Sequence, residues 1–340
     1  MDMAALRKKA REEMKGYCRV CPVCDGRACA GEVPGMGGAG SGSAFFANLE
    51  ALKAWRLNMR TIHGVKEADT TVSLFGKTLS MPILAAPMTG VVYNMGGRLA
   101  EDVYSEIIIA GCEAAGTMGM CGDGADPAMY AGGIKAIAAH NGHGVPFIKP
   151  RAQDAVLSLI RDAEEAKAVA VGMDIDGAGL ITMALKGQPV GPKTFVELKE
   201  LAASTNLPFI VKGVMTPDEA QLAVSAGAAA IVVSNHGGRV LDHTPGAAEV
   251  LPAIAAKVKG RAVILADGGV RTGADVLKLL ALGADSALVG RPMAVAAFGG
   301  GVEGVAAWLG KMQGELVSAM LLTGTASVRE VSPDILAARP

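Results

Sequence analysis

The chain has 340 residues, of which 51% are hydrophobic and only 4% aromatic, and its mean hydropathy is +0.35. This composition excludes a disordered chain and is typical of an α/β protein rich in small residues, long enough for one large domain or two ordinary ones. The 32 basic and 33 acidic residues leave a net charge of −1, so no global charge favours nucleic acid or an anionic membrane as a partner.

Residues 1–15 are charged and amphipathic, and they contain no apolar core of the length that a secretory signal needs. The longest mostly uncharged run, 220–235, is interrupted by Gly227 and is better explained as a helix end, a turn and a strand than as a membrane span. We therefore expect a cytoplasmic protein without a membrane span.

Four of the six cysteines form a C-x2-C-x2-C-x4-C pattern, namely Cys18, Cys21, Cys24 and Cys29, and a glycine-rich run, 35–42, follows them. A reducing compartment keeps thiols free, so this cluster indicates metal or redox chemistry more than disulfides. Zinc or an iron–sulfur cluster would accept thiolate ligands, although the spacing matches neither a zinc ribbon nor a complete ferredoxin motif. A loop of ordinary reduced cysteines is the equal alternative.

From residue 80 onward, short apolar runs alternate with helical stretches such as 152–167, 217–226 and 273–282. The runs are 82–87, 114–120, 145–150, 168–175, 208–213, 229–235, 262–268 and 286–292. Eight strands that alternate with helices predict an α/β fold, a (β/α)8 TIM barrel preceded by a Cys/Gly-rich extension. A doubly wound fold would place a G-x-G-x-x-G fingerprint after the first strand, and the segment 86–90 lacks it.

The active sites of such barrels lie at the carboxyl ends of the strands. Residues that could form part of a binding or catalytic site occupy these ends: Pro87, Lys149, Asp174, Lys212, His236, Asp267 and Arg291.

The run 231–233 is the best strand signal in the chain, and Gly237 and Gly238 end it. His236 and Arg239 therefore lie three residues apart where a buried strand meets solvent, a position that favours chemistry. Taken alone, the stretch is equally compatible with an ordinary hairpin turn.

Two arginine-bearing glycine turns follow strands seven and eight. Asp267-Gly268-Gly269-Val270-Arg271 comes first, and Gly290-Arg291-Pro292 follows. Glycines let backbone N–H groups approach an anion and arginines add charge-assisted bonds, so two such turns on adjacent strands predict a phosphate site. Flavin mononucleotide (FMN) is the leading candidate for the phosphorylated ligand.

Lys212 ends the fifth strand and is expected to point into the mouth of the barrel. A cation there would stabilise negative charge that develops at N1 and O2 of a flavin during reduction. The same position suits a Schiff-base lysine, so an aldolase or a phosphosugar-binding barrel without flavin is an alternative.

Together, the motif Ser234-Asn235-His236-Gly237-Gly238-Arg239, the segment Val211-Lys212-Gly213 and the two phosphate turns resemble the FMN-dependent 2-hydroxy acid oxidase and dehydrogenase family. Glycolate oxidase and lactate oxidase are members of it. The resemblance covers roughly residues 34–335. It implies oxidation of a small 2-hydroxy acid to the 2-oxo acid, with a proton taken by a histidine base and a hydride equivalent reaching flavin N5.

The resemblance also implies roles for individual residues. His236 would be the base, Asp174 would orient it, and Arg239 would hold the substrate carboxylate. Lys212 would lie beside flavin N1 and O2. The remaining expected FMN contacts are Pro87, Met88, Thr89, Lys149, Ser234, Asp267, Gly268, Gly269, Arg271, Gly290 and Arg291.

The chain departs from this family at the substrate. Pro34 and Pro146 stand where family members usually carry tyrosines, and the segment 174–180 lacks a second substrate-binding arginine. Polar flavin contacts are replaced by Gly122, Gly144 and Gly172. Lost bonds to a charged group are worth roughly 1.5–3 kcal/mol each, so we expect Lys149 or Arg151 to supply substitute cations.

We expect residues 1–79 to form a helical, Cys/Gly-rich segment packed on the barrel, and residues 80–340 to form the FMN-binding barrel with C-terminal helices. The expected partners are a small-molecule substrate and further copies of the chain, as a tetramer or octamer, but no nucleic acid. The alternative function is an FMN redox protein with another substrate, coupled to a metal or Fe-S site on the cysteines.

Overall fold

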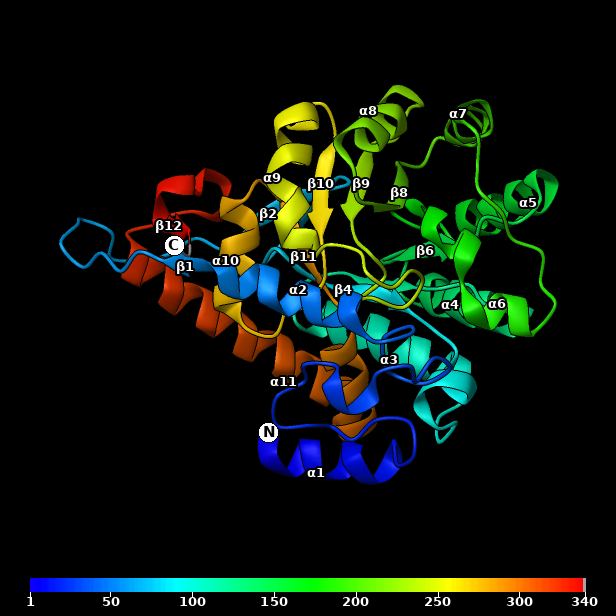
Figure 1. Ribbon diagram of the computed structural model, residues 1–340, viewed down its shortest axis with the longest axis horizontal. Helices are drawn as coiled ribbons and strands as arrows, with labels where there is room; N and C mark the ends of the chain where they lie inside the picture. The colour runs from blue at the N-terminus through cyan, green and yellow to red at the C-terminus, as the bar shows by residue number, and fades with distance from the viewer. Residues whose placement is uncertain (339–340) are drawn as a thin grey trace.

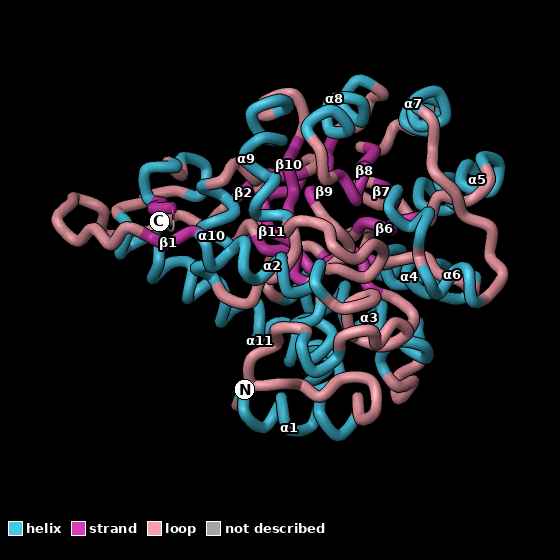
Figure 2. The backbone as a smooth tube through the Cα atoms, viewed as in Figure 1, coloured by secondary structure: helices cyan, strands magenta, loops and turns pink. Residues whose placement is uncertain are grey.

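Eight parallel strands close into a barrel in the order β10-β11-β4-β5-β6-β7-β8-β9. The computed structural model describes residues 1–338. The barrel strands are β4 (Ile83–Met88), β5 (Gly119–Cys121), β6 (Val145–Ile148), β7 (Val171–Asp174), β8 (Phe209–Val214), β9 (Ala230–Val233), β10 (Val263–Ala266) and β11 (Ser286–Val289). The predicted TIM barrel is therefore confirmed, and its strands lie at the centre of Figure 2.

Helices follow the strands and cover the outside of the barrel. They are α3 (Glu101–Ala114), α4 (Pro127–Ala139), α5 (Gln153–Glu165), α6 (Ile181–Leu185), α7 (Phe195–Ala203), α8 (Pro217–Ser225), α9 (Ala247–Val258), α10 (Gly273–Ala281) and α11 (Arg291–Thr323). Thr216 caps α8 by accepting a bond from the N–H of Glu219, and Pro217 takes the first helical position, as the sequence predicts.

One strand begins later than predicted. The second apolar run was expected to be a strand over 114–120, but α3 continues through Ala114 and the strand covers only Gly119–Cys121. Gly116 has a φ of +72° and turns the chain between the two elements. Apolar residues of a buried helix end and of a buried strand look alike in sequence, which explains the error.

Two apolar cores result from this arrangement. Inside the barrel, large side chains from the strands fill the interior, among them Leu84, Phe147, Val232, Leu265 and Leu288. A second and larger core lies between the strands and the surrounding helices. Strands buried on both faces are nearly continuously hydrophobic, which is why the apolar runs predicted them well.

The N-terminal residues pack on the barrel at several places. Helix α1 (Met3–Glu13) lies along α11, and α2 (Ser43–Ala54) contacts α9 (Figure 1). Strand β1 (Trp55–Leu57) pairs with β12 (Leu336–Ala338), and β2 (Val72–Leu74) pairs with β3 (Lys77–Leu79). The division of the chain at residue 80 stays a prediction. Residues 339–340, the end of the predicted barrel segment, lie outside the described part of the chain.

Helix α11 is the one described helix with the length and hydropathy of a membrane-spanning segment. It is broken at Gly301, which has φ 58° and ψ −147°. Its apolar side chains, such as Val305, Leu309 and Met312, are buried, and the helix packs against α1, α3 and α10. These contacts explain its apolar composition as that of a core helix.

Candidate active site

A cavity of about 1070 Å³, counting its solvent-open part, lies at the carboxyl ends of the barrel strands. This size suits a nucleotide cofactor with a small substrate. Most of the expected site residues line it: Pro87, Met88, Thr89, Lys149, Lys212, His236, Arg239, Asp267, Gly268, Gly269, Arg271, Gly290 and Arg291. The other two, Asp174 and Ser234, are fully buried beside the cavity.

The loop after β9 holds His236 in an uncommon backbone conformation. His236 has a φ of +57°, and Gly237 and Gly238 follow at +63° and +77°. The N–H of His236 donates to Ser234 Oγ at 3.0 Å, which fixes the turn. A Cβ at Gly238 would lie 2.2 Å from the backbone nitrogen of Phe45, so only glycine lets α2 pack here. Left-handed backbone at a non-glycine residue is typical of functional sites.

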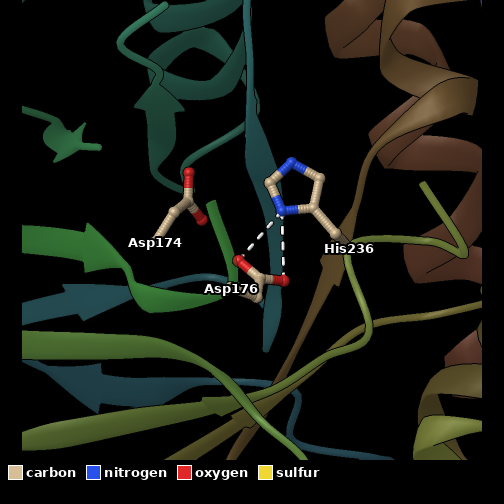
Figure 3. A group of neighbouring side chains, drawn as sticks. All are labelled: Asp174, Asp176 and His236. Carbon is tan, nitrogen blue, oxygen red and sulfur yellow. Dashed lines mark hydrogen bonds and ion pairs between the residues drawn. The ribbon is translucent and has the colours of Figure 1, made fainter. Parts of the chain in front are cut away.

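A carboxylate holds the imidazole of His236, but it is Asp176 and not the expected Asp174. Both carboxylate oxygens of Asp176 lie 3.1 Å from His236 Nδ1, as the dashed lines of Figure 3 show. Asp176 follows β7 in the short turn Ile175–Gly179 and packs on Gly213, where a Cβ would lie 2.6 Å from that of Asp176. Two residues beyond the strand end, the chain has turned far enough for this side chain to reach the loop after β9.

Asp174 instead lies between two buried lysines. Its Oδ2 accepts from Lys149 Nζ at 2.5 Å, and its Oδ1 pairs with Lys212 Nζ at 2.9 Å. The three side chains are almost completely buried. Asp174, Asp176 and His236 are close enough together to hold a metal ion. Two ammonium groups already neutralise Asp174, however. A histidine base held by a carboxylate therefore describes His236 and Asp176 better than a metal site does.

The electrostatics of this group favour a neutral histidine. Burial and the nearby Lys212 ammonium lower the pKa of His236 below its ordinary value, although Asp176 opposes them. Burial alone would raise the pKa of Asp174, but Lys149 and Lys212 hold it well below its usual range. Burial would likewise lower the pKa of Lys212, and Asp174 raises it. A neutral imidazole beside two fixed cations can accept a proton at neutral pH.

The raised pKa of Lys212 bears on the aldolase alternative. A Schiff-base lysine must be an uncharged amine to attack a carbonyl, which requires a lowered pKa. Lys212 is paired with Asp174 and stays protonated. The structure therefore disfavours this alternative.

We predict that Asp176→Asn shifts the pH dependence of turnover. Asp176 raises the pKa of His236 through its charge and its hydrogen bond, so removing the charge lowers that pKa further. The acid limb of the kcat/KM profile should move to lower pH, while the maximum falls because the imidazolium loses its partner. Steady-state profiles from pH 4.5 to 8 measure this. An acid limb that moves to higher pH would refute the assignment.

Arg239 contacts the glycine-rich segment that precedes α2. Its Nη1 donates to the carbonyls of Gly35 at 2.5 Å and Gly37 at 3.1 Å, and its Nη2 donates to Asn94 Oδ1 at 2.9 Å. The expected bond to a substrate carboxylate is therefore replaced here by neutral acceptors. Arg239 still lines the same cavity as His236, which precedes it by three residues in the chain.

Arg291 also differs from the expectation of a free phosphate ligand. It donates to the carbonyls of Met36, Gly37 and Gly237 at 2.8 to 3.1 Å, and its guanidinium lies 3.8 Å from the ring centre of Phe45. It thus ties the glycine-rich segment to the catalytic loop. Arg291 lines the cavity, but backbone carbonyls occupy its donors.

Two unpartnered buried atoms at the first phosphate turn show that the cavity suits a phosphorylated, hydroxyl-bearing ligand. Among residues 1–338, Arg271 Nε is a buried donor without a hydrogen-bond partner, and Asp267 Oδ1 is a buried acceptor without one. Asp267 Oδ2 accepts from Ser234 Oγ at 2.8 Å, and burial raises the pKa of Asp267 to about 6. Gly268 and Gly269, both at positive φ, lie between them. A phosphate and a sugar-alcohol chain would satisfy both atoms.

We expect Arg271→Met to weaken the binding of FMN. The lost charge-assisted bond is worth roughly 1.5–3 kcal/mol, which corresponds to a Kd increase of roughly 10- to 150-fold. Quenching of flavin fluorescence during titration of the apoprotein measures the Kd. Arg161→Met, an exposed position on α5, is the matched control and should bind FMN like the wild type. Equal affinities of both variants for FMN would show that Arg271 does not bind the cofactor.

Several residues of the site were missed by the sequence reasoning. Tyr93, Asn94 and Thr182 line the cavity and offer hydroxyl and amide groups. Glu101 accepts bonds from the N–H groups of Gly90 at 2.9 Å and Val91 at 2.8 Å, and so fixes the turn after β4. None of them belongs to a recognisable motif. The acid in the first turn of α3 was the only available signal.

Of the two proposed substitute cations, only Lys149 reaches the cavity. Arg151 donates from Nε and Nη2 to the carboxylate of Asp123 at 2.9 Å each, and from Nη1 to Gln188 at 3.0 Å. It is therefore committed to an ion pair. Lys149 lies beside Asp174 and lines the cavity.

The fold and this cavity define a class of protein, the barrel oxidoreductases that use a flavin nucleotide as cofactor. The chain belongs to the FMN-dependent dehydrogenase family, whose model matches residues 35–184 and 180–338. FMN is accordingly its cofactor, and the residues expected to bind it line the cavity. The match begins C-terminal to the four cysteines, so it gives no support to the predicted zinc or iron–sulfur site.

Relatives and solved structures agree with this family. An L-lactate dehydrogenase of Pseudomonas paraeruginosa (strain DSM 24068 / PA7) is 32% identical over 354 residues, which cover 88% of this chain and 92% of that protein. A 2-hydroxyacid oxidase of Dictyostelium discoideum is 46% identical over 143 residues, which cover 42% of this chain and 37% of that protein. A mandelate oxidase crystallised with (S)-2-phenylpropionate superposes with a TM-score of 0.79 at 28% identity, covering 98% of this chain and 97% of that one.

Proposed function

We propose that this protein oxidises a small 2-hydroxy acid to the corresponding 2-oxo acid with FMN. The observation that carries the proposal is a buried histidine with a lowered pKa, held by Asp176, in a cavity that also contains Lys149, Lys212 and Arg239. A base surrounded by cations suits a substrate that carries a carboxylate and loses a proton. The names of the relatives, lactate dehydrogenase, 2-hydroxyacid oxidase and mandelate oxidase, support the same substrate class.

In this proposal, His236 removes the substrate proton with Nε2, the ring nitrogen away from Asp176. Asp176 accepts a bond from Nδ1–H, selects that tautomer and stabilises the imidazolium that forms. When bound, FMN supplies the acceptor for the hydride equivalent that leaves the substrate carbon. Lys212, fixed by Asp174, holds a permanent positive charge inside the cavity, where it would stabilise negative charge on a bound, reduced flavin.

Arg239 binds the substrate carboxylate by exchanging the neutral carbonyls of Gly35 and Gly37 for a charged acceptor. A guanidinium–carboxylate pair is stronger than bonds to carbonyls, so the exchange is favourable. Tyr93 and Asn94 line the same cavity and replace the hydroxyl contacts that Pro34 and Pro146 cannot make.

Product formation tests the proposal. Anaerobic incubation of the FMN-loaded protein with glycolate, lactate or mandelate should yield one 2-oxo acid per flavin, whereas lactamide, which lacks the carboxylate, should react far more slowly. A reaction that proceeds equally with the acid and the amide would contradict the role given to the cations.

The other expected properties remain proposals. We propose a homo-oligomer, a tetramer or an octamer, which sedimentation velocity would distinguish from a monomer. We also propose a cytoplasmic location.

A further inference from the structure

A second cavity, of about 640 Å³ counting its solvent-open part, lies beside the flavin cavity and is lined by four thiols. They belong to Cys18, Cys21, Cys24 and Cys29, the cysteines of the N-terminal motif. All four are free and only partly buried, whereas the other two cysteines of the chain are fully buried. Nothing in the proposed hydroxy acid chemistry uses this cavity.

The loop that carries the thiols is fixed to the helix before it. Arg7 Nη2 donates to the carbonyl of Cys21 at 2.5 Å, and Arg11 Nη2 donates to that of Val20 at 2.9 Å. Val20 has a φ of +44°, a left-handed conformation that is costly for a β-branched residue. Ordinary reduced cysteines do not require such a turn, whereas ligands that must converge do.

N–H groups and cations surround the sulfur atoms. The N–H of Val20 donates to Cys18 Sγ at 3.4 Å, and Arg271 Nη2 donates to Cys24 Sγ at 3.5 Å. Arg7, Arg271 and Arg291 line the cavity, and no carboxylate except Asp25 does so. Trp308 also lines it, and its buried Nε1 donor has no partner. Hydrogen bonds to sulfur and nearby cations stabilise the negative charge of a thiolate-bound cluster.

The spacing of the thiols separates the two candidate metals. A tetrahedral zinc ion with Zn–S bonds of about 2.3 Å holds its sulfur atoms about 3.8 Å apart. Within residues 1–338, no three of the cysteine Sγ atoms lie within 4.8 Å of one another. A cubane cluster binds each thiolate at a different corner, so its four sulfur ligands lie farther apart than those of a zinc ion.

We propose that Cys18, Cys21, Cys24 and Cys29 bind a [4Fe–4S] cluster next to the flavin. Met36, Arg271 and Arg291 line both cavities, so the two sites adjoin each other at these side chains. The cluster would place a one-electron centre beside a two-electron cofactor. The motif lies outside the residues matched by the family model, so the site is an addition to the barrel enzyme.

Iron and sulfide analysis tests this proposal without reference to turnover. Protein purified anaerobically, or reconstituted with ferrous iron and sulfide, should contain roughly four iron and four acid-labile sulfide per chain and give an electron paramagnetic resonance signal after reduction. The double variant C21S/C24S should lose both while keeping its FMN content, which shows that the barrel is folded. The double variant C112A/C121A, at the two buried cysteines, is the control and should keep the cluster.

Three results would overturn the proposal: iron below a tenth of an equivalent in reconstituted wild type (on the order of background), full iron in C21S/C24S, or stoichiometric zinc without sulfide. None of these results would affect the oxidation of a hydroxy acid by the flavin.

Discussion

Replacing Asp174 by asparagine is expected to lower the free energy of unfolding by about 3–5 kcal/mol, because it takes the nearest countercharge from two buried ammonium groups. Asp174 is fully buried, with Lys149 Nζ at 2.5 Å and Lys212 Nζ at 2.9 Å. Asparagine keeps the shape of the side chain, so the loss reports the charge and not a cavity. The pKa of Asp174 is lowered in the folded state, so its contribution is complete above the unfolded pKa of about 3.9 and is lost as the pH falls below it.

Urea unfolding at pH 7 measures this loss. Asp154→Asn, at an exposed position on α5, is the control and should change stability by less than about 1 kcal/mol. The double variant Lys149→Met with Asp174→Asn removes one of the unpaired cations, so it should recover part of the loss. A loss below about 1 kcal/mol for Asp174→Asn, or no recovery in the double variant, would show that the ion triad is not a buried network.

Replacing His236 by glutamine is expected to slow flavin reduction by roughly 10²- to 10⁴-fold, the usual contribution of a positioned general base. Glutamine retains a polar side chain of similar length but cannot accept a proton. FMN should stay bound, because all but one of the groups that we assign to the cofactor lie on other strand ends, and Ser234 is unchanged in this variant. Anaerobic stopped-flow absorbance measures the reduction rate directly.

His243→Gln provides the matched control for this prediction. It lies in the same loop, but its side chain is 80% exposed and it does not line the flavin cavity. We expect it to reduce its flavin at the wild-type rate. A His236→Gln variant that reacts within a factor of about three of the wild type would exclude His236 as the base, since a general base contributes far more than that.

The barrel, and the fact that most of the expected site residues line one cavity, were accessible from the sequence. Buried parallel strands are continuous apolar runs, and glycine, histidine and arginine in fixed order mark their ends. Both phosphate turns line one cavity as predicted. Each of these features depends on where the strands end along the chain, and local sequence patterns indicate those ends.

The partners of individual side chains were not accessible in the same way. Asp174 and Asp176 both follow β7, and only the three-dimensional turn decides that Asp176 faces His236. Arg239 and Arg291 bond to carbonyls of residues 35–37, which are 202 to 255 residues away in the chain, so no local pattern predicts these bonds.

The four N-terminal cysteines show the same difference between what local sequence predicts and what only the structure reveals. The spacing of Cys18, Cys21, Cys24 and Cys29 predicts a shared site but cannot place it in the fold. In the structure, the four line a cavity that shares Arg271 and Arg291 with the flavin site. The two arginines expected to bind phosphate therefore also face the thiols.

The central claim is that a 2-hydroxy acid reduces FMN in the cavity at the strand ends. The direct measurement is the flavin absorbance of the purified, FMN-loaded protein during anaerobic titration with glycolate, lactate and mandelate. We predict that at least one of these acids bleaches the flavin completely and that His236→Gln suppresses the bleaching. A protein that binds FMN but keeps its full absorbance with every 2-hydroxy acid would contradict the proposed substrate class.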